Sequence, residues 1–240
     1  MGWVGPKAGR RHRASYWIRA ALVAVAVVLL APYLLAPLYR FVDPISTPML
    51  WRWLTGNRVE HRFVPIESMA PSLPATVIIA EDARYCSHSG IDFQGLRNIV
   101  AEADNAHRLR GGSTITQQTA KNLFLWQRRS IVRKALEFPL ALWIDLVLPK
   151  RRVLEIYLNV AEWGPRGEFG AEAAARRDFG KSVRDLTPAE SALLVSALPN
   201  PARRNPQQPS SNLQRLAGIY EARAAAALGA SDCVRSRRTP

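Results

Sequence analysis

The chain has 240 residues, 48% of them hydrophobic and 22% charged. This composition supplies a core, which excludes a wholly disordered chain, a collagen-like repeat and a small disulfide scaffold, and the length suits one catalytic-sized domain with an appendage. The 33 Lys and Arg residues against 19 Asp and Glu give a formal net charge of +14. So basic a chain is expected to bind an anionic partner such as nucleic acid, phospholipid or a phosphorylated substrate.

The first predicted element is a membrane-spanning helix over residues 20–40. The 19 residues from Ala20 to Leu38 include no charged residue, and as a helix they would reach about 28 Å, close to the ~30 Å hydrocarbon core. A cleaved signal peptide is the alternative, but its apolar region would be shorter, at about 7 to 15 residues, and no small-x-small cleavage motif follows. Because five basic residues precede the span and only Arg40 directly follows it, residues 1–19 are expected to form a cytoplasmic basic tail and the rest to be exported.

Residues 41–64 are expected to form a membrane-proximal connector, because the stretch from residue 43 onwards is rich in proline and aromatic side chains. Trp51 and Trp53 suit the headgroup level of a bilayer, but a pair packed against the domain is equally compatible with the sequence. The sequence leaves these two placements open.

The predicted main domain covers residues 65–210, and helical spacing of apolar residues dominates it from Ala75 onward. In its last segment Thr187 is the expected N-cap, with Pro188 at the first helical position and Glu190 completing a capping box. The sequence contains no alternating strand series and no internal repeat, so we predict a mainly α fold with at most a small sheet. The predicted segments are residues 76–85, which start as a buried run, 93–106, 130–148, 150–162, 168–180 and 187–198.

Residues 211–240 are expected to form a C-terminal helix followed by a loose basic tail that contains Cys233. The other cysteine, Cys86, is expected to be a small buried residue. An oxidising compartment would permit the two to pair, but these placements do not favour a disulfide.

An adjacent carboxylate pair follows the buried run of the first helical segment. The apolar residues Val77 to Ala80 deliver Glu81 and Asp82 to a turn-rich stretch, where desolvation and a neighbouring like charge would raise a carboxyl pKa. Such a pKa suits a general base. Helix capping or a plain surface acid is the structural alternative, which the pair alone does not exclude.

Residues 110–124, RGGSTITQQTAKNLF, form a dense polar stretch that ends in a lysine-bearing helix. Gly111 and Gly112 permit close backbone approach, and the hydroxyl and amide groups beside Lys121 would suit phosphate or sugar oxygens. The spacing of a Walker phosphate-binding loop is absent from the stretch. A solvated polar loop is the alternative interpretation.

A basic cluster follows, in which only Glu137 and Asp145 interrupt the positive charge. Such a cluster would bind a diphosphate through charge-assisted hydrogen bonds. Arg133 and Glu137 also stand at i and i+4 of one predicted helix, so a simple ion pair worth about 0.3–0.5 kcal/mol explains them equally well. The cluster comprises Lys121, Arg128, Arg129, Arg133, Lys134, Lys150, Arg151 and Arg152.

Four segments in this order resemble the successive motifs of the peptidoglycan glycosyltransferase family, namely EDARYCSHSG, GGSTITQQTAKNLF, RKALE and RRVLEIYLN. The resemblance spans about residues 65–206 and closes with AEAAARRDFGK and AESALLVSALPNPARRNP. It implies a lysozyme-like glycosyltransferase domain and, because no room remains for a transpeptidase domain, membership of the monofunctional biosynthetic branch. That branch polymerises lipid II into glycan strands by inverting transfer and releases polyprenyl diphosphate, from the periplasmic face of the bacterial inner membrane.

The resemblance also implies roles for individual positions. Glu81 would be the base that deprotonates the acceptor 4-hydroxyl. Glu137 would be the second essential carboxylate, acting at the donor diphosphate directly or through a divalent cation, Mg²⁺ or Mn²⁺; no other cofactor is implied. The remaining positions would bind substrate, with Lys121 and Arg129 at the leaving diphosphate, Ser113, Gln117 and Gln118 in the donor pocket, and Asp82, Arg133 and Lys134 in support.

Lipid II, the growing glycan strand and membrane lipid are the partners that the resemblance implies, with penicillin-binding or cell-division proteins as further candidates and no nucleic acid. Two alternatives come from other classes. An exported lysozyme-like glycan hydrolase would need no phosphate-binding basic cluster, and a membrane-anchored anion-binding scaffold would explain the charge without an enzyme. The carboxylates with a cationic stretch between them favour the transferase.

The sequence departs from the family pattern at three places. Tyr85 stands where phenylalanine is usual, the loop 163–170 is one residue longer than usual, and Asp178 occupies a position where an aromatic residue is common. The first change keeps the aromatic ring, and the other two leave the local loop geometry open.

Overall fold

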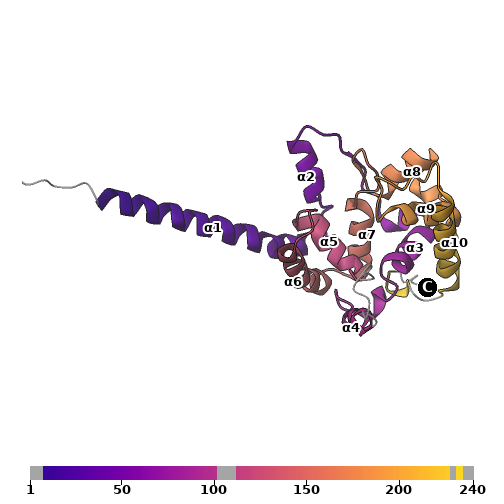
Figure 1. Ribbon diagram of the computed structural model, residues 1–240, viewed down its shortest axis with the longest axis horizontal. Helices are drawn as coiled ribbons and strands as arrows, with labels where there is room; N and C mark the ends of the chain where they lie inside the picture. The colour runs from indigo at the N-terminus through magenta and orange to yellow at the C-terminus, as the bar shows by residue number, and fades with distance from the viewer. Residues whose placement is uncertain (1–7, 102–111, 228–230, 235–240) are drawn as a thin grey trace, which may run out of the picture.

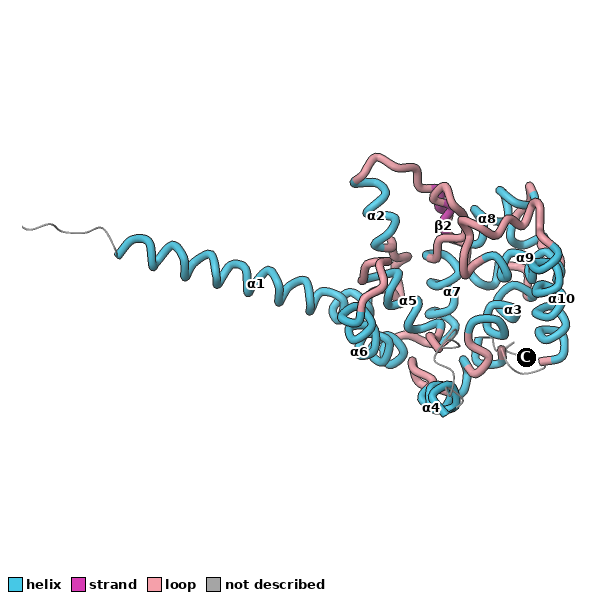
Figure 2. The backbone as a smooth tube through the Cα atoms, in the orientation of Figure 1, coloured by secondary structure: helices cyan, strands magenta, loops and turns pink. Residues whose placement is uncertain are grey.

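The computed structural model describes residues 8–101, 112–227 and 231–234. A long helix, α1 (Ala8–Leu38), projects from a helical domain (Figure 1). Within the described ranges the sheet consists of two short strands: β1 (Glu60–His61) pairs in parallel with β2 (Glu168–Phe169). The chain is therefore mainly helical with a small sheet, as predicted (Figure 2).

Helix α1 begins earlier than predicted, within the basic N-terminal segment. Its stretch Ser15–Leu38 is 24 residues long and apolar enough to cross a membrane. Near the end of the helix, Pro37 lacks an N–H and leaves the carbonyl of Tyr33 without its helical donor. The indole Nε1 of Trp143, on α6 (Ile131–Val147), donates a 3.0 Å hydrogen bond to that carbonyl. This bond fastens the end of α1 to the domain.

The connector contains a short helix, α2 (Thr47–Leu54), that is buried on one side only. The Ser46 side chain caps this helix by accepting a hydrogen bond from the N–H of Met49. Met49 is fully buried, whereas Trp51 and Trp53 are 68% and 48% exposed. The two tryptophans therefore do not form a packed pair against the domain.

Helix α7 (Lys150–Val160) runs between two hydrophobic clusters and supplies side chains to both. The other described helices are α3 (Ser72–Glu81), α4 (Phe93–Ala101), α5 (Ile115–Phe124), α8 (Ala171–Phe179), α9 (Pro188–Ala197) and α10 (Ser211–Ala226), with short 3-10 turns η1 (Ile66–Ser68), η2 (Tyr85–Ser87), η4 (Val183–Asp185) and η5 (Asp232–Val234). Leu154 and Leu158 pack with α3 and α9 in the first cluster, and Val153 and Ile156 pack with α5 and α6 in the second. Polar side chains link the end of α3 to α5 through Glu81 and Gln118, and α6 to the segment before α5 through Lys134 and Ser113.

Described helices occur within each predicted helical segment. The capping box of α9 is confirmed, because Thr187 Oγ1 accepts from the N–H of Glu190, and Glu190 Oε2 accepts from the N–H of Thr187 at 2.8 Å. A second capping box, which was not predicted, starts α5 with Thr114 and Gln117. Residues 102–106, together with Arg110 and Gly111 of the polar stretch, lie outside the described residues.

Cys86 and Cys233 form a disulfide, with their Cα atoms 5.6 Å apart, so the expectation against pairing is wrong. Cys86 is exposed rather than buried. Residues 231–234 are not loose, because Val234 is 5% exposed within the first cluster and its carbonyl accepts a 2.8 Å hydrogen bond from Arg151 Nη1. Burial of this one apolar side chain helps to place Cys233 beside η2.

The three departures from the family pattern each have a local structural explanation. The hydroxyl of Tyr85 donates a 2.8 Å hydrogen bond to the carbonyl of Lys150, which docks η2 onto the start of α7. In the longer loop Gly167 has a φ of +91°, and a Cβ atom there would meet the backbone of the connector. The Asp178 side chain is 1% exposed and pairs with Arg177 at 2.6 Å. The extra hydroxyl and the extra charge are therefore both satisfied.

Candidate active site

Glu81 is the last residue of α3, whose other side chains are mostly apolar and buried. Burial raises the pKa of the Glu81 carboxyl above its ordinary value of 4.5, and the charge of Asp82 adds to the rise. A 2.8 Å hydrogen bond from Gln118 Nε2 to Oε2 opposes the rise, as do the charges of Lys121 and Arg204. The carboxyl group is therefore more basic than usual, as a general base requires.

Asp82 is buried, and its carboxylate is engaged within the protein. Its Oδ1 lies 2.9 Å from His88 Nε2, and its Oδ2 accepts a 3.0 Å hydrogen bond from the backbone N–H of Ile115, the first residue of α5. A negative charge at a helix N-terminus is favourable. Asp82 therefore fixes the turn after α3 against the start of α5.

At the start of α5, the neighbouring side chains of Gln117 and Gln118 have different partners. Thr114 Oγ1 accepts a hydrogen bond from the N–H of Gln117, and Gln117 Oε1 accepts one of 3.0 Å from the N–H of Thr114. The Gln117 side chain is thus used by the helix cap, and the residue is only 1% exposed. The next residue, Gln118, reaches Glu81 instead.

Glu137, on α6, is 2% exposed and contacts two cations directly. Arg133, one turn earlier, forms an ion pair with Oε1, and Lys134 Nζ lies 2.9 Å from Oε2. Lys134 Nζ also donates a 2.8 Å hydrogen bond to Ser113 Oγ, which joins α6 to the part of the polar stretch that precedes α5. The ion pair that the i, i+4 spacing allowed is therefore present, as one part of a larger network.

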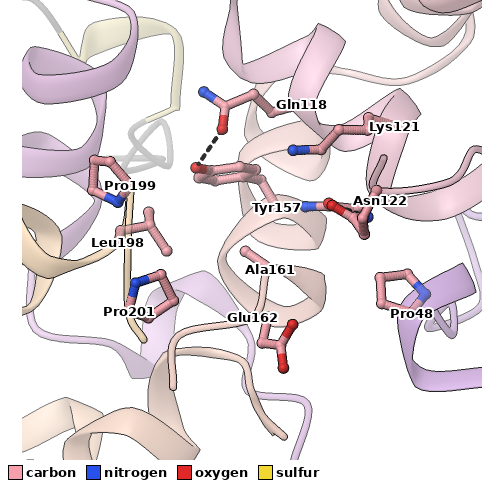
Figure 3. A pocket seen from close by; sticks show the side chains of 11 residues that line it. Pro48, Gln118, Lys121, Asn122, Tyr157, Ala161, Glu162, Leu198, Pro199 and Pro201 are labelled. Atoms are coloured by element: carbon pink, nitrogen blue, oxygen red, sulfur yellow. Dashed lines mark hydrogen bonds between the residues drawn. The ribbon is translucent and has the colours of Figure 1, made fainter. Parts of the chain in front are cut away.

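Lys121, on α5, interacts electrostatically with both Glu81 and Glu137. Burial and the charge of Arg133 lower the pKa of its ammonium group, whereas Glu137 and Glu81 raise it. No carboxylate of the described residues forms an ion pair with Lys121, so its charge is available to an anionic ligand. Figure 3 shows its amino group directed toward a cavity.

Two cavities adjoin these side chains. The first, of about 210 Å³, is lined by Gln118, Lys121 and a wall of proline and leucine that includes Pro199 (Figure 3). The second, of about 250 Å³, is lined by Glu81 and Ser113 among others. The hydrogen bond between Gln118 and Glu81 connects the two cavities, and Ser113 connects the second to the cations around α6. Glu81 thus lines the second cavity directly, and Glu137 is linked to that cavity through Lys134 and Ser113.

Arg129 stands apart from this network. It lies exposed in the loop between α5 and α6, and within the described part of the chain it makes no hydrogen bond or ion pair with the other predicted site residues. Two residues that were not predicted do act on Glu81. Arg204 lowers its pKa, and the Tyr157 hydroxyl donates a 3.1 Å hydrogen bond to Gln118 (Figure 3). Local spacing cannot reveal the second contact, which joins residues 39 positions apart.

The side chains around Glu137 do not fit a protein-bound divalent cation. Mg²⁺ and Mn²⁺ prefer several oxygen ligands, but the described residues contain no group of three or more His, Cys, Asp or Glu that would supply them. Both oxygens of Glu137 are engaged by Arg133 and Lys134. The groups beside Glu137 that can contact a diphosphate are therefore the cationic side chains of Arg133 and Lys134.

Comparison with known proteins identifies the family. The transglycosylase family model matches residues 49–225. The biosynthetic peptidoglycan transglycosylase of Nitrobacter hamburgensis is 54% identical over 210 residues, which cover 88% of this chain and 93% of the relative. The proteins of the same name from Rhodopseudomonas palustris strain HaA2 and Agrobacterium fabrum are 56% identical over 211 residues (88% and 93% of the two chains) and 45% identical over 215 residues (89% and 95%).

The matched region contains both candidate carboxylates and every residue that lines the two cavities except Pro48, and the relatives align with this chain over nearly their whole length. These findings favour the transferase over the hydrolase and the scaffold that the sequence left as alternatives. The chain belongs to the transglycosylase family and is a peptidoglycan glycosyltransferase of cell wall biosynthesis.

Proposed function

We propose that Glu81 is the general base of lipid II polymerisation and takes the proton of the acceptor 4-hydroxyl group. The acceptor oxygen attacks C1 of the donor sugar, and the bond from C1 to the diphosphate breaks with its electron pair going to the diphosphate. An α-linked donor then gives a β-linked product in one inverting step. The observation that carries this proposal is a half-buried carboxyl with a raised pKa that lines the second cavity and is hydrogen-bonded to Gln118, which lines the first.

The leaving diphosphate would bind on the α5 and α6 side of this junction. Lys121 has no carboxylate partner in the described structure, and Lys134 reaches toward the second cavity through Ser113. Charge-assisted hydrogen bonds from these ammonium groups would stabilise the negative charge that develops on the leaving oxygen. Glu137 would orient Lys134 and Arg133 for this task, and Arg129 would add a further cation from its exposed loop.

The remaining predicted residues divide into direct and indirect roles. Ser113 and Gln118 line the cavities, and we assign them to the donor sugar. Asp82 and Gln117 have their polar atoms engaged at the turn after α3 and at the cap of α5. These two would therefore act on substrate only by positioning Glu81 and Gln118.

The apolar helix α1 supports a single-pass anchor, since its 24-residue stretch is long enough to span a bilayer. We propose that residues 1–19 lie in the cytoplasm and that the connector 41–64, the domain 65–210 and the C-terminal region 211–240 lie in the periplasm. External protease should then digest the domain in spheroplasts and spare an N-terminal fragment. Penicillin-binding and cell-division proteins are proposed partners on the family resemblance alone.

The catalytic assignment is tested by the variant Glu81→Gln in purified full-length protein, with lipid II as substrate. The variant should bind lipid II and produce no glycan strands. Glu67→Gln makes the same chemical change at a side chain that is 62% exposed and outside both cavities, and it should polymerise normally. Chain growth at the wild-type rate in Glu81→Gln would overturn the assignment.

A further inference from the structure

A chain of two hydrogen bonds leads from the centre of the domain to Glu81. The hydroxyl of Tyr157, on α7, donates to Gln118 Oε1 at 3.1 Å (Figure 3), and Gln118 Nε2 donates to Glu81 Oε2 at 2.8 Å. Tyr157 is 1% exposed and packs in the first hydrophobic cluster. The chain therefore begins at a rigid, buried point of the fold and ends at the edge of the second cavity.

The chemistry of the two end groups fixes the orientation of the amide between them. A carboxylate can only accept hydrogen bonds, so it selects the NH₂ side of Gln118. A phenol whose proton is retained must donate to the other side, the carbonyl oxygen. Burial, reinforced by the charge of Glu81, raises the pKa of Tyr157 well above 10.0, so its hydroxyl remains protonated. If the amide turned over, both hydrogen bonds would be lost.

From this geometry, and resting on the proposed role of Glu81 as base, we propose that Tyr157 is a positioning residue that locks the Gln118 amide so that Oε1 of Glu81 is the atom that takes the acceptor proton. Oε2 is occupied by Gln118. Oε1 accepts no hydrogen bond from any residue that the structure describes. The proton of the 4-hydroxyl would pass to Oε1 as the new bond to C1 forms and the diphosphate leaves.

The amide also sets the basicity of the carboxylate. The hydrogen bond from Gln118 favours the charged form of Glu81 and so lowers its pKa. Without the hydroxyl of Tyr157, the amide is free to rotate and donates less regularly, so the pKa should rise. The other groups that shift the pKa of this carboxyl would be unchanged, namely Asp82 after α3, Lys121 on α5 and Arg204 after α9. Tyr220, on α10, has its own pKa raised by the charge of Glu81 but is not among the groups that shift the pKa of Glu81.

The test is the variant Tyr157→Phe in full-length protein with lipid II as substrate. We expect kcat to fall roughly threefold to tenfold, the range of one lost hydrogen bond, with little change in KM. The acid limb of the kcat profile should move to higher pH. Tyr220→Phe is the matched control, because the charge of Glu81 raises the pKa of Tyr220 but no hydrogen bond among the described contacts joins Tyr220 to Tyr157, Gln118 or Glu81. It should keep the wild-type kcat and pH profile.

A double-variant cycle separates positioning from packing. Once Gln118→Leu has removed the amide, adding Tyr157→Phe should cause no further loss of kcat. The same fold-loss in both backgrounds, or an unmoved pH profile, would overturn the positioning role. If Glu81→Gln itself remained active, the proposed function would fail. If Glu81→Gln were inactive while Tyr157→Phe matched wild type, only the present inference would fail.

Discussion

Glu81 lines the second cavity and Glu137 is linked to it through Lys134 and Ser113, but the two carboxylates occupy opposite kinds of environment. Glu81 ends an apolar helix and receives one amide hydrogen bond among the described contacts, so burial dominates and its pKa is raised. Glu137 is compensated by direct contact with an arginine and a lysine. The comparison teaches that the environment decides what a glutamate can do. A glutamate whose negative charge is poorly compensated suits proton abstraction, whereas one that is paired with cations suits their placement.

The largest expected effects come from replacing each glutamate with glutamine, which tests the difference between the two environments. We expect Glu81→Gln to lose about 10²-fold or more in kcat, because the base is gone. Glu137→Gln should also lose activity, but it leaves the buried Arg133 without its counter-charge, which should cost about 3 kcal/mol of stability. Glu81→Gln removes a desolvated charge and should not lower Tm. Thermal melts of both variants in one detergent measure the difference.

The pH dependence of stability provides the control for this prediction. Because the folded-state pKa of Glu81 lies above 4.5, its contribution to stability is present below that value and is lost as pH rises through the folded pKa. The stability of wild type relative to Glu81→Gln should therefore fall as pH rises across that window. A flat difference would contradict the raised pKa, and equal Tm losses in both glutamine variants would contradict the comparison itself.

Removing a cation between the carboxylates should have the next largest effect. Lys121→Met keeps the apolar stem and deletes a charge that has no carboxylate partner in the described structure, so the fold should be retained. We expect kcat/KM for lipid II to fall about 10²-fold, the scale of a lost transition-state charge contact. Arg129→Ala, at an exposed loop position, should lose less. A larger loss in Arg129→Ala would place the diphosphate nearer that loop.

Removing the disulfide should have a smaller effect. It should change activity only through the position of Glu81. The double variant Cys86→Ser/Cys233→Ser is expected to lose about 2–4 kcal/mol in denaturant unfolding. Activity should fall a few-fold, because η2 lies between Asp82 and His88, which fix the turn beside Glu81. Reductant should lower Tm of the wild type and leave the double variant unchanged. Equal sensitivity of the two proteins would show that the reductant acts elsewhere.

The smallest expected effect concerns the junction of the anchor and α6. Trp143→Phe keeps an aromatic ring but loses the hydrogen bond to the carbonyl that Pro37 frees, which should cost about 0.5–1.5 kcal/mol. We expect Tm in detergent to fall slightly and kcat to stay near wild type. Combining Trp143→Phe with Pro37→Ala, which restores the helical donor to Tyr33, should recover part of the loss. No recovery would mean that ring packing and not the hydrogen bond fastens α1.

Local spacing predicted the parts of the fold that depend on neighbours in the chain. The apolar span, the helix around Glu137, the capping box at Thr187 and the optional pair of Arg133 with Glu137 all involve residues within a few positions of one another. The capping box at Thr114 follows the same rule, but its polar residues were interpreted as ligand-binding groups. Gln117 shows that the sequence alone does not distinguish a glutamine that caps a helix from one that binds a ligand.

Long-range contacts could not be predicted in this way. Asp82 meets the start of α5 across 33 positions, and Tyr157 meets Gln118 across 39. The disulfide joins residues 147 positions apart, and the sequence predicts a buried Cys86 and a loose tail around Cys233 because nothing local marks Val234 as a core residue. Such contacts depend on how the helices pack around α7, which composition and spacing do not specify. The family resemblance supplied the candidate roles, but not the partners through which these side chains act.

The bond between Cys86 and Cys233 sets an order of events in the maturation of this enzyme. Its second thiol is synthesised 147 positions after the first, so the loop beside the base cannot be locked until nearly all of the domain has been made. Cross-linking also needs an oxidising environment, which the bacterial cytosol does not provide. In the periplasmic orientation proposed above, a chain stalled during export would lack the disulfide, so full activity would be confined to molecules whose domain has crossed the membrane.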